Sequence, residues 1–165
     1  MQSKIYSYCI YLLSKQDYSE FKMRQKLRQK RDFLPHEIDE TIASLKAKGY
    51  LREDAYRRLF IRKWMQKGES EQKIRQRGAM EKLQFEPEEF STVEEELGFN
   101  EDDSIEKLVE KKLRSKEIPS DSKERGKLRD KVLRFLISKG HGYDEAKKAL
   151  SKRFNSASAA DSELF

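Results

Sequence analysis

Hydrophobic side chains near the start of the chain recur every three or four residues, which is the spacing of one face of an α-helix. The residues with this spacing are Ile5, Tyr8, Cys9, Leu12 and Leu13. Paired positions with the same spacing return at 59–60 with 63–64, and again at 108–109 with 112–113, so the pattern repeats about every 50 residues. A fixed period of this length indicates a protein built from repeated helical units.

The segments that follow the first two of these helices are also alike. A strongly basic helix is expected at 19–31 in the first unit and at 70–83 in the second. A further helix is expected to begin at Pro35 and at Pro87, because the first turn of a helix does not use the N–H that proline lacks. These similarities predict three helices in each unit.

The ends of the third helices and the last unit complete the pattern. Glycine ends the two third helices, at Gly49 and Gly98, where a left-handed cap is expected. In the last unit, helices are expected at about 103–115, after a capping-box pattern at 121–124, and at 143–153. The last unit therefore also contains three helices, although its sequence departs from the other two.

The complete pattern predicts an all-α fold, an elongated, curved array of three tandem three-helix repeats with about nine helices. A single unit of about 50 residues is marginally stable alone, and stacking allows neighbours to cover each other's apolar faces. The expected boundaries are repeat 1 at 1–51, repeat 2 at 52–101, repeat 3 at 102–154 and a flexible tail at 155–165.

Composition and charge agree with an extended shape and indicate an anionic partner. Charged residues make up 40% of the 165 residues and hydrophobic residues 36%, which is polar for one compact globule. The net charge is +6, but residues 83–106 contain ten acidic residues and no Lys or Arg, which leaves a net charge of +16 on the rest. This basic remainder favours nucleic acid, or a protein assembled on it, as the partner.

The cysteine count and the hydrophobic runs predict a cytoplasmic protein. Cys9 is the only cysteine, so an intrachain disulfide and a cysteine-built metal site are excluded, and a reducing compartment is expected. No apolar run approaches the roughly 18 residues of a membrane span. The N-terminal segment lacks the small-residue cleavage site of a signal peptide, so we expect no contact with a membrane.

The sequence carries no motif for catalysis, cofactor binding or metal binding. It contains no phosphate-binding glycine loop, nucleophile elbow or paired-carboxylate motif. His36 and His141 are isolated, and Glu94, Glu95 and Glu96 are consecutive, so they splay around a helix and cannot converge on an ion. We therefore expect no enzymatic activity, no catalytic residue, no cofactor and no metal ion.

Three segments of the chain, at 12–30, 44–76 and 130–150, together show a pattern known from one protein family. The segment SLKAKGYLREDAYRRLFIRKWMQKGESEQKIRQ at 44–76 shows it most strongly. With these segments the chain resembles the RecX family, the bacterial regulators of the RecA recombinase. The likeness covers about residues 5–153, in order and with the same unit length. It is specific through its extent, since no single motif in it is unique to the family.

The resemblance implies a regulator without enzymatic activity of its own. RecX-type proteins bind active RecA filaments along the helical groove and inhibit ATP hydrolysis, strand exchange and co-protease activity. We therefore expect a monomer that inhibits RecA in recombination, DNA repair and the SOS response, and that meets single-stranded DNA within the filament, with weak direct DNA binding. The chain departs from the family pattern in the more acidic segment 80–103 and at Gly78-Ala79, where a stronger apolar residue is usual.

Basic residues on the second helix of repeat 1 and on the first two helices of repeat 2 are the candidate contacts with the filament or DNA. Like charges at this density are destabilising unless a partner neutralises them. The alternative is a solvated face whose aliphatic stems cover apolar surface. The candidates are Arg24, Arg28, Arg57, Arg58, Arg62, Lys63, Lys67, Lys73, Arg75 and Arg77.

Within this set, the arginines of the helix at 53–67 have large apolar neighbours. Arg58 and Arg62 lie one turn apart, with Ile61 and Met65 beside them. Arginine mixed with large apolar residues is typical of interface anchors. For Ile61 and Met65, packing against another unit is the equal alternative, and we expect Trp64 to belong to the core.

Three alternatives stay open at this point. Helix-turn-helix proteins also have three-helix units with one basic helix, so a module that acts directly on DNA is the rival function. Such a module should bind duplex DNA without recombinase and with a steep salt dependence.

The acidic segment 83–106 is interpreted as solvated or, alternatively, as a contact for a basic filament surface. The terminal DSELF at 161–165 is interpreted as a disordered tail, and its faint likeness to sliding-clamp peptides, without their leading Gln, is the alternative.

Overall fold

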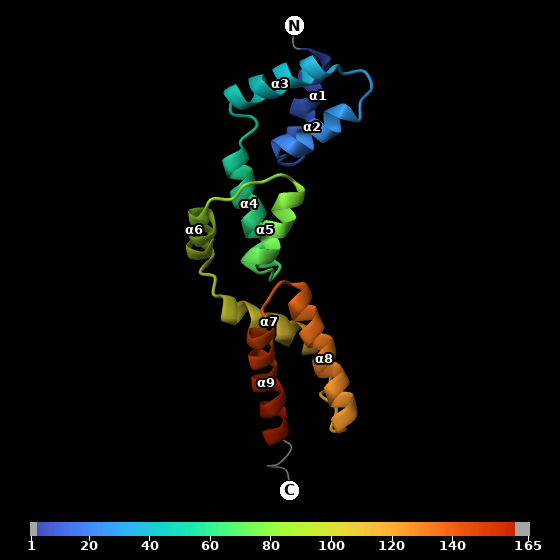
Figure 1. The fold of residues 1–165 in the computed structure, drawn as a ribbon, viewed down its shortest axis with the longest axis vertical. Coiled ribbons are helices and arrows are strands. Elements are labelled where there is room, and N and C mark those ends of the chain that lie inside the picture. Colours follow the sequence, from blue (N-terminus) through green and yellow to red (C-terminus); the bar gives the residue numbers. More distant parts are fainter. Residues whose placement is uncertain (1–2, 161–165) are drawn as a thin grey trace. The chain divides into compact units, whose positions relative to one another are not determined.

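The computed structural model describes the backbone of residues 3–160 and the side chains of residues 3–155. Within this range the chain forms nine α-helices and no strand, which confirms the all-α prediction and the tandem three-helix arrangement (Figure 1). The helices are α1 (Lys4–Leu13), α2 (Glu20–Arg28), α3 (Pro35–Ala47), α4 (Glu53–Gln66), α5 (Glu71–Met80), α6 (Pro87–Leu97), α7 (Glu101–Leu113), α8 (Ser122–Ser138) and α9 (Tyr143–Ala160).

The chain divides into two compact units, and their borders fall inside helices α4, α5 and α6. Unit 1 contains Met1–Arg62 and Arg75–Phe90. Unit 2 contains Lys63–Ile74 and Ser91–Phe165. The repeat boundaries expected from the sequence are not tested by this division, so they stay a prediction, as does the curved shape.

The core of unit 1 is formed mainly by the first three helices. Ile5 and Cys9 are buried in it as the helical spacing predicted, and Tyr8, Leu12 and Leu13 are partly buried against it. Burial raises the pKa of the Cys9 thiol to about 11, so this side chain packs as a small apolar group. The buried members are Ile5, Tyr6, Cys9, Tyr18, Met23, Leu27, Ile38, Ile42, Leu45 and Leu51.

The core of unit 2 lies among α7, α8 and α9, which pack on one another (Figure 1). Its buried members are Ile105, Leu108, Val109, Leu113, Val132, Leu136, Ala146, Leu150 and Phe154. Helix α9 continues past Arg153 to Ala160, so the prediction of a short last helix was wrong and residues 155–160 are helical instead of a tail. Phe154 is buried, so the apolar face of α9 extends past the end that was predicted at Arg153. The DSELF segment at 161–165 lies outside the described residues.

The helix ends agree with the local signals in the sequence. Pro35 and Pro87 are the first residues of α3 and α6, as predicted. Gly49 and Gly98 follow the ends of these helices with φ angles of 71° and 56°, which confirms the left-handed caps. Asp121 caps α8 by accepting a hydrogen bond from the backbone N–H of Glu124, at 2.8 Å.

The described part of the chain contains neither a membrane-spanning helix nor a cluster of metal-binding side chains. No helix there has both the length and the apolar character needed to cross a bilayer. No group of three or more His, Cys, Asp or Glu side chains in the same range is arranged to hold a metal ion.

Candidate basic interface

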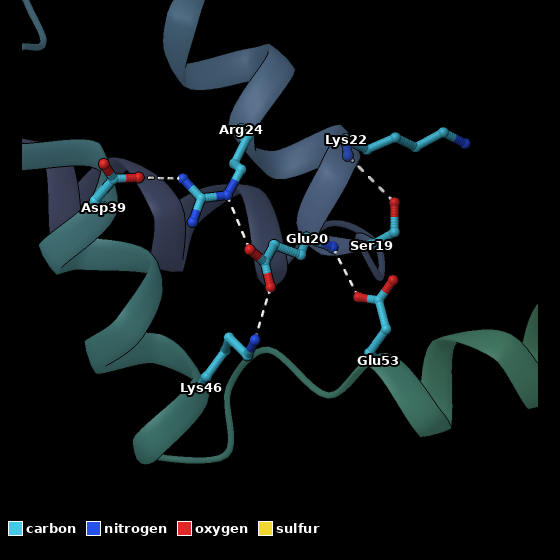
Figure 2. Close-up of polar contacts among 7 residues, drawn as sticks. All are labelled: Ser19, Glu20, Lys22, Arg24, Asp39, Lys46 and Glu53. Atoms are coloured by element: carbon cyan, nitrogen blue, oxygen red, sulfur yellow. Dashed lines mark hydrogen bonds and ion pairs between the residues drawn. The ribbon is translucent and has the colours of Figure 1, made fainter. Parts of the chain in front are cut away.

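Arg24 lies in an ion-pair network that joins α2 to α3 (Figure 2). Its Nε donates to Glu20 Oε1 at 2.9 Å, and its Nη1 donates to Asp39. The second Glu20 oxygen accepts from Lys46 Nζ at 2.7 Å. The charge of Arg24 is therefore balanced inside unit 1, where the residue stabilises the packing of two helices.

The start of α2 is held by two further contacts in the same network (Figure 2). Ser19 Oγ accepts from the backbone N–H of Lys22 at 3.2 Å, and Glu53 Oε2 accepts from the backbone N–H of Glu20 at 2.9 Å. The hydrogen bond from Lys46 lowers the pKa of the Glu20 carboxyl below its ordinary value; partial burial opposes this, and the bond from Arg24 adds to the lowering.

Arg57 is engaged by a carboxylate of the acidic segment. Its Nε lies 2.8 and 3.0 Å from the two carboxylate oxygens of Glu89, and both side chains are mostly buried. This pair connects α4 to α6 within unit 1 and uses the positive charge internally. Part of the acidic segment is therefore a structural partner of the basic helices and is not simply solvated.

Lys22 forms a second contact of this kind, with Tyr56 and Glu81. Its Nζ lies 2.7 Å from Glu81 Oε1, and the Tyr56 hydroxyl donates to the other Glu81 oxygen at 2.9 Å. Burial raises the pKa of Tyr56, and the hydrogen bond to Glu81 adds to this effect. The contact fixes α2, α4 and the end of α5 to one another.

Arg75 contacts two aromatic residues of unit 1, Phe85 and Phe90. Its guanidinium lies 4.4 Å from the centre of the Phe90 ring, and Nη1 donates to the Phe85 carbonyl at 3.3 Å. A Cβ on Gly78 would lie 2.1 Å from Cε2 of Phe85, so only glycine fits against this ring. The apolar side chain expected at Gly78 from the family pattern is therefore supplied by Phe85. Arg77, one turn before Met80, is half-buried.

Arg58 and Arg62, the arginines proposed as interface anchors on α4, have one exposed apolar neighbour and two buried ones. Arg58 is exposed and Arg62 is half-buried, while Leu59 between them is 48% exposed. Ile61 and Met65 are 0% and 2% exposed, so the packing alternative holds for both. Arg58 and Leu59 are exposed on α4, as is Lys63, and Arg28 on α2 is likewise exposed.

Trp64 is half-buried, so the prediction that it belongs to the core is correct only in part. The ammonium groups of Lys63 and Lys67 lie 5.4 and 4.5 Å from the centre of the indole ring. Both lysines are exposed, and these cation–π contacts restrict where their charges lie. Lys73 is half-buried, and its backbone N–H donates to Ser70 Oγ at 3.3 Å, which caps α5.

Two loops of unit 2 are joined by hydrogen bonds over 70 residues of sequence. The backbone N–H of Ser70 donates to Lys139 O at 3.0 Å, and Ser70 Oγ donates to Gly140 O at 2.8 Å. Lys139 Nζ also lies 3.6 Å from Glu69, a carboxylate that is only 2% exposed. We call these contacts the loop clasp.

His141 completes the loop clasp and was missed by the sequence analysis. Its side chain is buried, with Nε2 2.8 Å from Gly68 O and Nδ1 3.3 Å from Glu101 Oε1. The carbonyl oxygen can only accept, so Nε2 carries a proton. The sequence offered no signal for this role, because both partners, Gly68 and Glu101, come from distant segments.

The comparisons with known proteins agree in both sequence and fold. The family model for the first three-helix domain of RecX matches residues 6–45. Regulatory protein RecX of Haemophilus influenzae strain PittEE is 30% identical over 145 residues, which is 88% of this chain and 91% of that protein. The protein of the same name from Mannheimia succiniciproducens is 33% identical over 76 residues, covering 46% of this chain and 49% of that protein. A crystal structure of regulatory protein RecX matches with a TM-score of 0.64 at 18% identity, over 88% of this chain and 71% of that chain.

Proposed function

The chain belongs to the RecX family of regulatory proteins, and from this premise we propose that it regulates the RecA recombinase, mainly as an inhibitor. It binds in the groove of the RecA–DNA filament in the cytoplasm and modulates ATP hydrolysis, strand exchange and co-protease activity, and hence recombination and the SOS response. The observation that carries the proposal is the alignment with a regulatory protein RecX over 88% of this chain.

The distribution of charge supports binding to an extended anionic assembly. Repeated helical units present basic residues at several places along one chain, so several weak contacts add to one another without any being strong. Arg28, Arg58, Lys63 and Lys67 are exposed and can meet filament or DNA. Arg24, Arg57 and Arg75 stabilise unit 1 through internal contacts, so a role in binding is secondary for them.

The test is inhibition of single-stranded-DNA-dependent ATP hydrolysis by RecA from the same organism. The wild-type protein is expected to inhibit at well below one molecule per recombinase, because one regulator contacts several protomers. The R58E/R62E variant is expected to lose at least tenfold in potency. K123E/K131E, which makes the same change of charge at two exposed positions of α8, is the matched control and is expected to retain it.

The rival function, a module acting on DNA alone, predicts a different titration. Inhibition would then appear only when the protein saturates the DNA, and it would depend on DNA concentration instead of recombinase concentration. Binding of duplex DNA without RecA, with a steep dependence on salt, would support the rival. Equal inhibition by the wild type and R58E/R62E would keep the family function and exclude this part of α4 from the contact.

A further inference from the structure

Unit 2 contains a groove of about 770 Å³ whose charged lining is nearly all lysine. It lies beside the end of α4, the α6–α7 loop, α7 and the end of α8. Asp103 is the one acidic residue among the described lining residues. The lysines are Lys67, Lys107, Lys111, Lys112 and Lys139, of which only Lys67 was among the candidates from the sequence.

The charges of the groove are not used to hold the fold together, unlike those of Arg24 and Arg57. Lys67, Lys107, Lys111 and Lys112 are exposed. Within the described part of the chain, none of these four forms an ion pair with a carboxylate, whereas Lys139 lies 3.6 Å from Glu69. Four positive charges around one hollow repel each other, and a bound anion removes that cost.

Aromatic rings restrict where three of the ammonium groups lie. Lys112 Nζ is 4.1 Å and Lys139 Nζ 5.9 Å from the centre of the Phe135 ring, and Lys67 Nζ is 4.5 Å from that of Trp64. A cation–π contact orients an ammonium group while leaving its N–H donors available. The groove therefore presents donors that are already partly ordered, which lowers the entropy lost on binding.

The cations of the lining fit a row of phosphate groups. All five cations are lysines. Lysine binds phosphate as a point charge on a flexible stem, so it needs no single bidentate geometry and can follow a chain of phosphates. Lys107 and Lys111 are four residues apart on α7, a rise of about 6 Å along the helix, so they can contact successive anionic groups.

The apolar part of the lining indicates a single strand. Leu97, Phe99 and Phe135 are partly exposed and contribute apolar surface to the lining. Proteins that bind single strands combine a basic groove with apolar and aromatic surface for unstacked bases. A duplex would offer its phosphates but no exposed base faces, so it would leave this surface uncovered.

We propose that the lysine-lined groove of unit 2 binds the phosphodiester backbone of single-stranded nucleic acid. The binding itself is independent of RecA. Only its use, as the contact with the single strand inside the filament, rests on the proposed function.

The experiment compares K107Q/K111Q with the wild type by fluorescence anisotropy of a labelled oligothymidine over a range of salt concentrations. The wild type is expected to bind, and the variant is expected to bind about tenfold more weakly, with the slope of log K against log salt reduced by about 1.4. K123Q/K131Q removes two exposed lysines of α8 and is expected to match the wild type. Both substitutions affect exposed side chains, and unchanged circular dichroism and melting temperature confirm that the variants are folded.

Three results would overturn the proposal. These are no binding of oligothymidine by the wild type, an equal loss in both lysine variants, or stronger competition by a polyglutamate peptide than by unlabelled oligothymidine. The RecA assay on the same samples separates this inference from the proposed function. If the wild type inhibits RecA but the groove variant binds oligothymidine normally, only the groove assignment fails. If the wild type does not inhibit RecA, the regulator proposal fails and the binding result still stands.

Discussion

Single residues of this chain have structural roles that depend on their immediate neighbours. Gly78 leaves room for the Phe85 ring, Cys9 is buried in the core of unit 1, and Glu20 pairs with Arg24 on its own helix and with Lys46 on α3. Gly126 shows the contrast, because a Cβ there would meet no atom within 4 Å. The same residue type is therefore required at one helical position and dispensable at another.

The first prediction compares these two glycines. Gly78→Ala is expected to lower the free energy of unfolding by about 1–3 kcal/mol, because the added Cβ overlaps Phe85. Gly126→Ala is expected to raise it by about 0.4–1 kcal/mol, because alanine reduces the entropy of the unfolded chain and favours the helix. Urea denaturation measures both. A Gly78→Ala protein as stable as the wild type would contradict the packing of Phe85 on α5.

A second prediction at this scale concerns Glu20 and pH. Since the folded-state pKa of Glu20 is lowered, its contribution to stability is present above the unfolded-state pKa of about 4.3 and is lost as pH falls through the folded-state value. The stability difference between the wild type and Glu20→Gln is therefore expected to be largest near neutral pH and to vanish in acid. Denaturant unfolding at several pH values measures it, with Glu40→Gln, at an exposed position of α3, as the control. A difference that does not change with pH would contradict the network in Figure 2.

At the scale of elements, the helices are defined by local caps but are held together by contacts between loops and helix ends. In unit 2, the loop clasp joins the segment before α5 to the segment between α8 and α9. In unit 1, the Arg57–Glu89 pair connects α4 to α6. These contacts join segments that the sequence separates, so each is a point where one substitution disturbs two elements.

The third prediction tests the loop clasp through Ser70. This side chain donates to Gly140 O and also caps α5 by accepting from the Lys73 N–H. Ser70→Ala is expected to reduce the unfolding free energy by about 1–2 kcal/mol, because a partly buried carbonyl and a helix N-terminus both lose a partner. Thermal unfolding measures the loss. Ser7→Ala, at an exposed position of α1, is the control and should remain within about 0.5 kcal/mol of the wild type.

At the scale of the whole molecule, the excess of positive charge is partly balanced by the acidic segment. Glu89 pairs with Arg57, and Glu106 pairs with Lys152 at 2.7 Å. The net charge of the chain is +6. Copies of a protein with this charge repel one another, so we expect binding to anionic partners in preference to self-association.

The fourth prediction follows from this charge. The protein is expected to sediment as a monomer of 19.6 kDa at moderate salt, over the concentrations used for the RecA assay. Sedimentation equilibrium measures the mass. A dimer that strengthens as protein concentration rises would show that part of the basic surface is covered in solution, and the stoichiometry of inhibition would then refer to dimers.

The all-α class, the number of helices and most of their ends followed from the sequence, because these features depend on local signals. Helical spacing of apolar residues, proline at helix starts and glycine at φ angles of 71° and 56° act within a few residues. The end of α9 was predicted too early because the sequence alone does not show that Phe154 is buried. The family, too, could be inferred, since its likeness is distributed along almost the whole chain.

The tertiary structure alone decided which basic residues are used internally and which face solvent. Arg24 and Arg28 lie one turn apart and look alike in the sequence, yet Arg24 is held by Glu20 and Asp39 while Arg28 is exposed. The lysines of the groove lie on α7 and beside α4 and α8, and His141 meets Gly68 across more than 70 residues of sequence. The sequence determines the charge of each residue. Whether two charged side chains form an ion pair depends on the distance between them, and only the packing of helices brings the partners together.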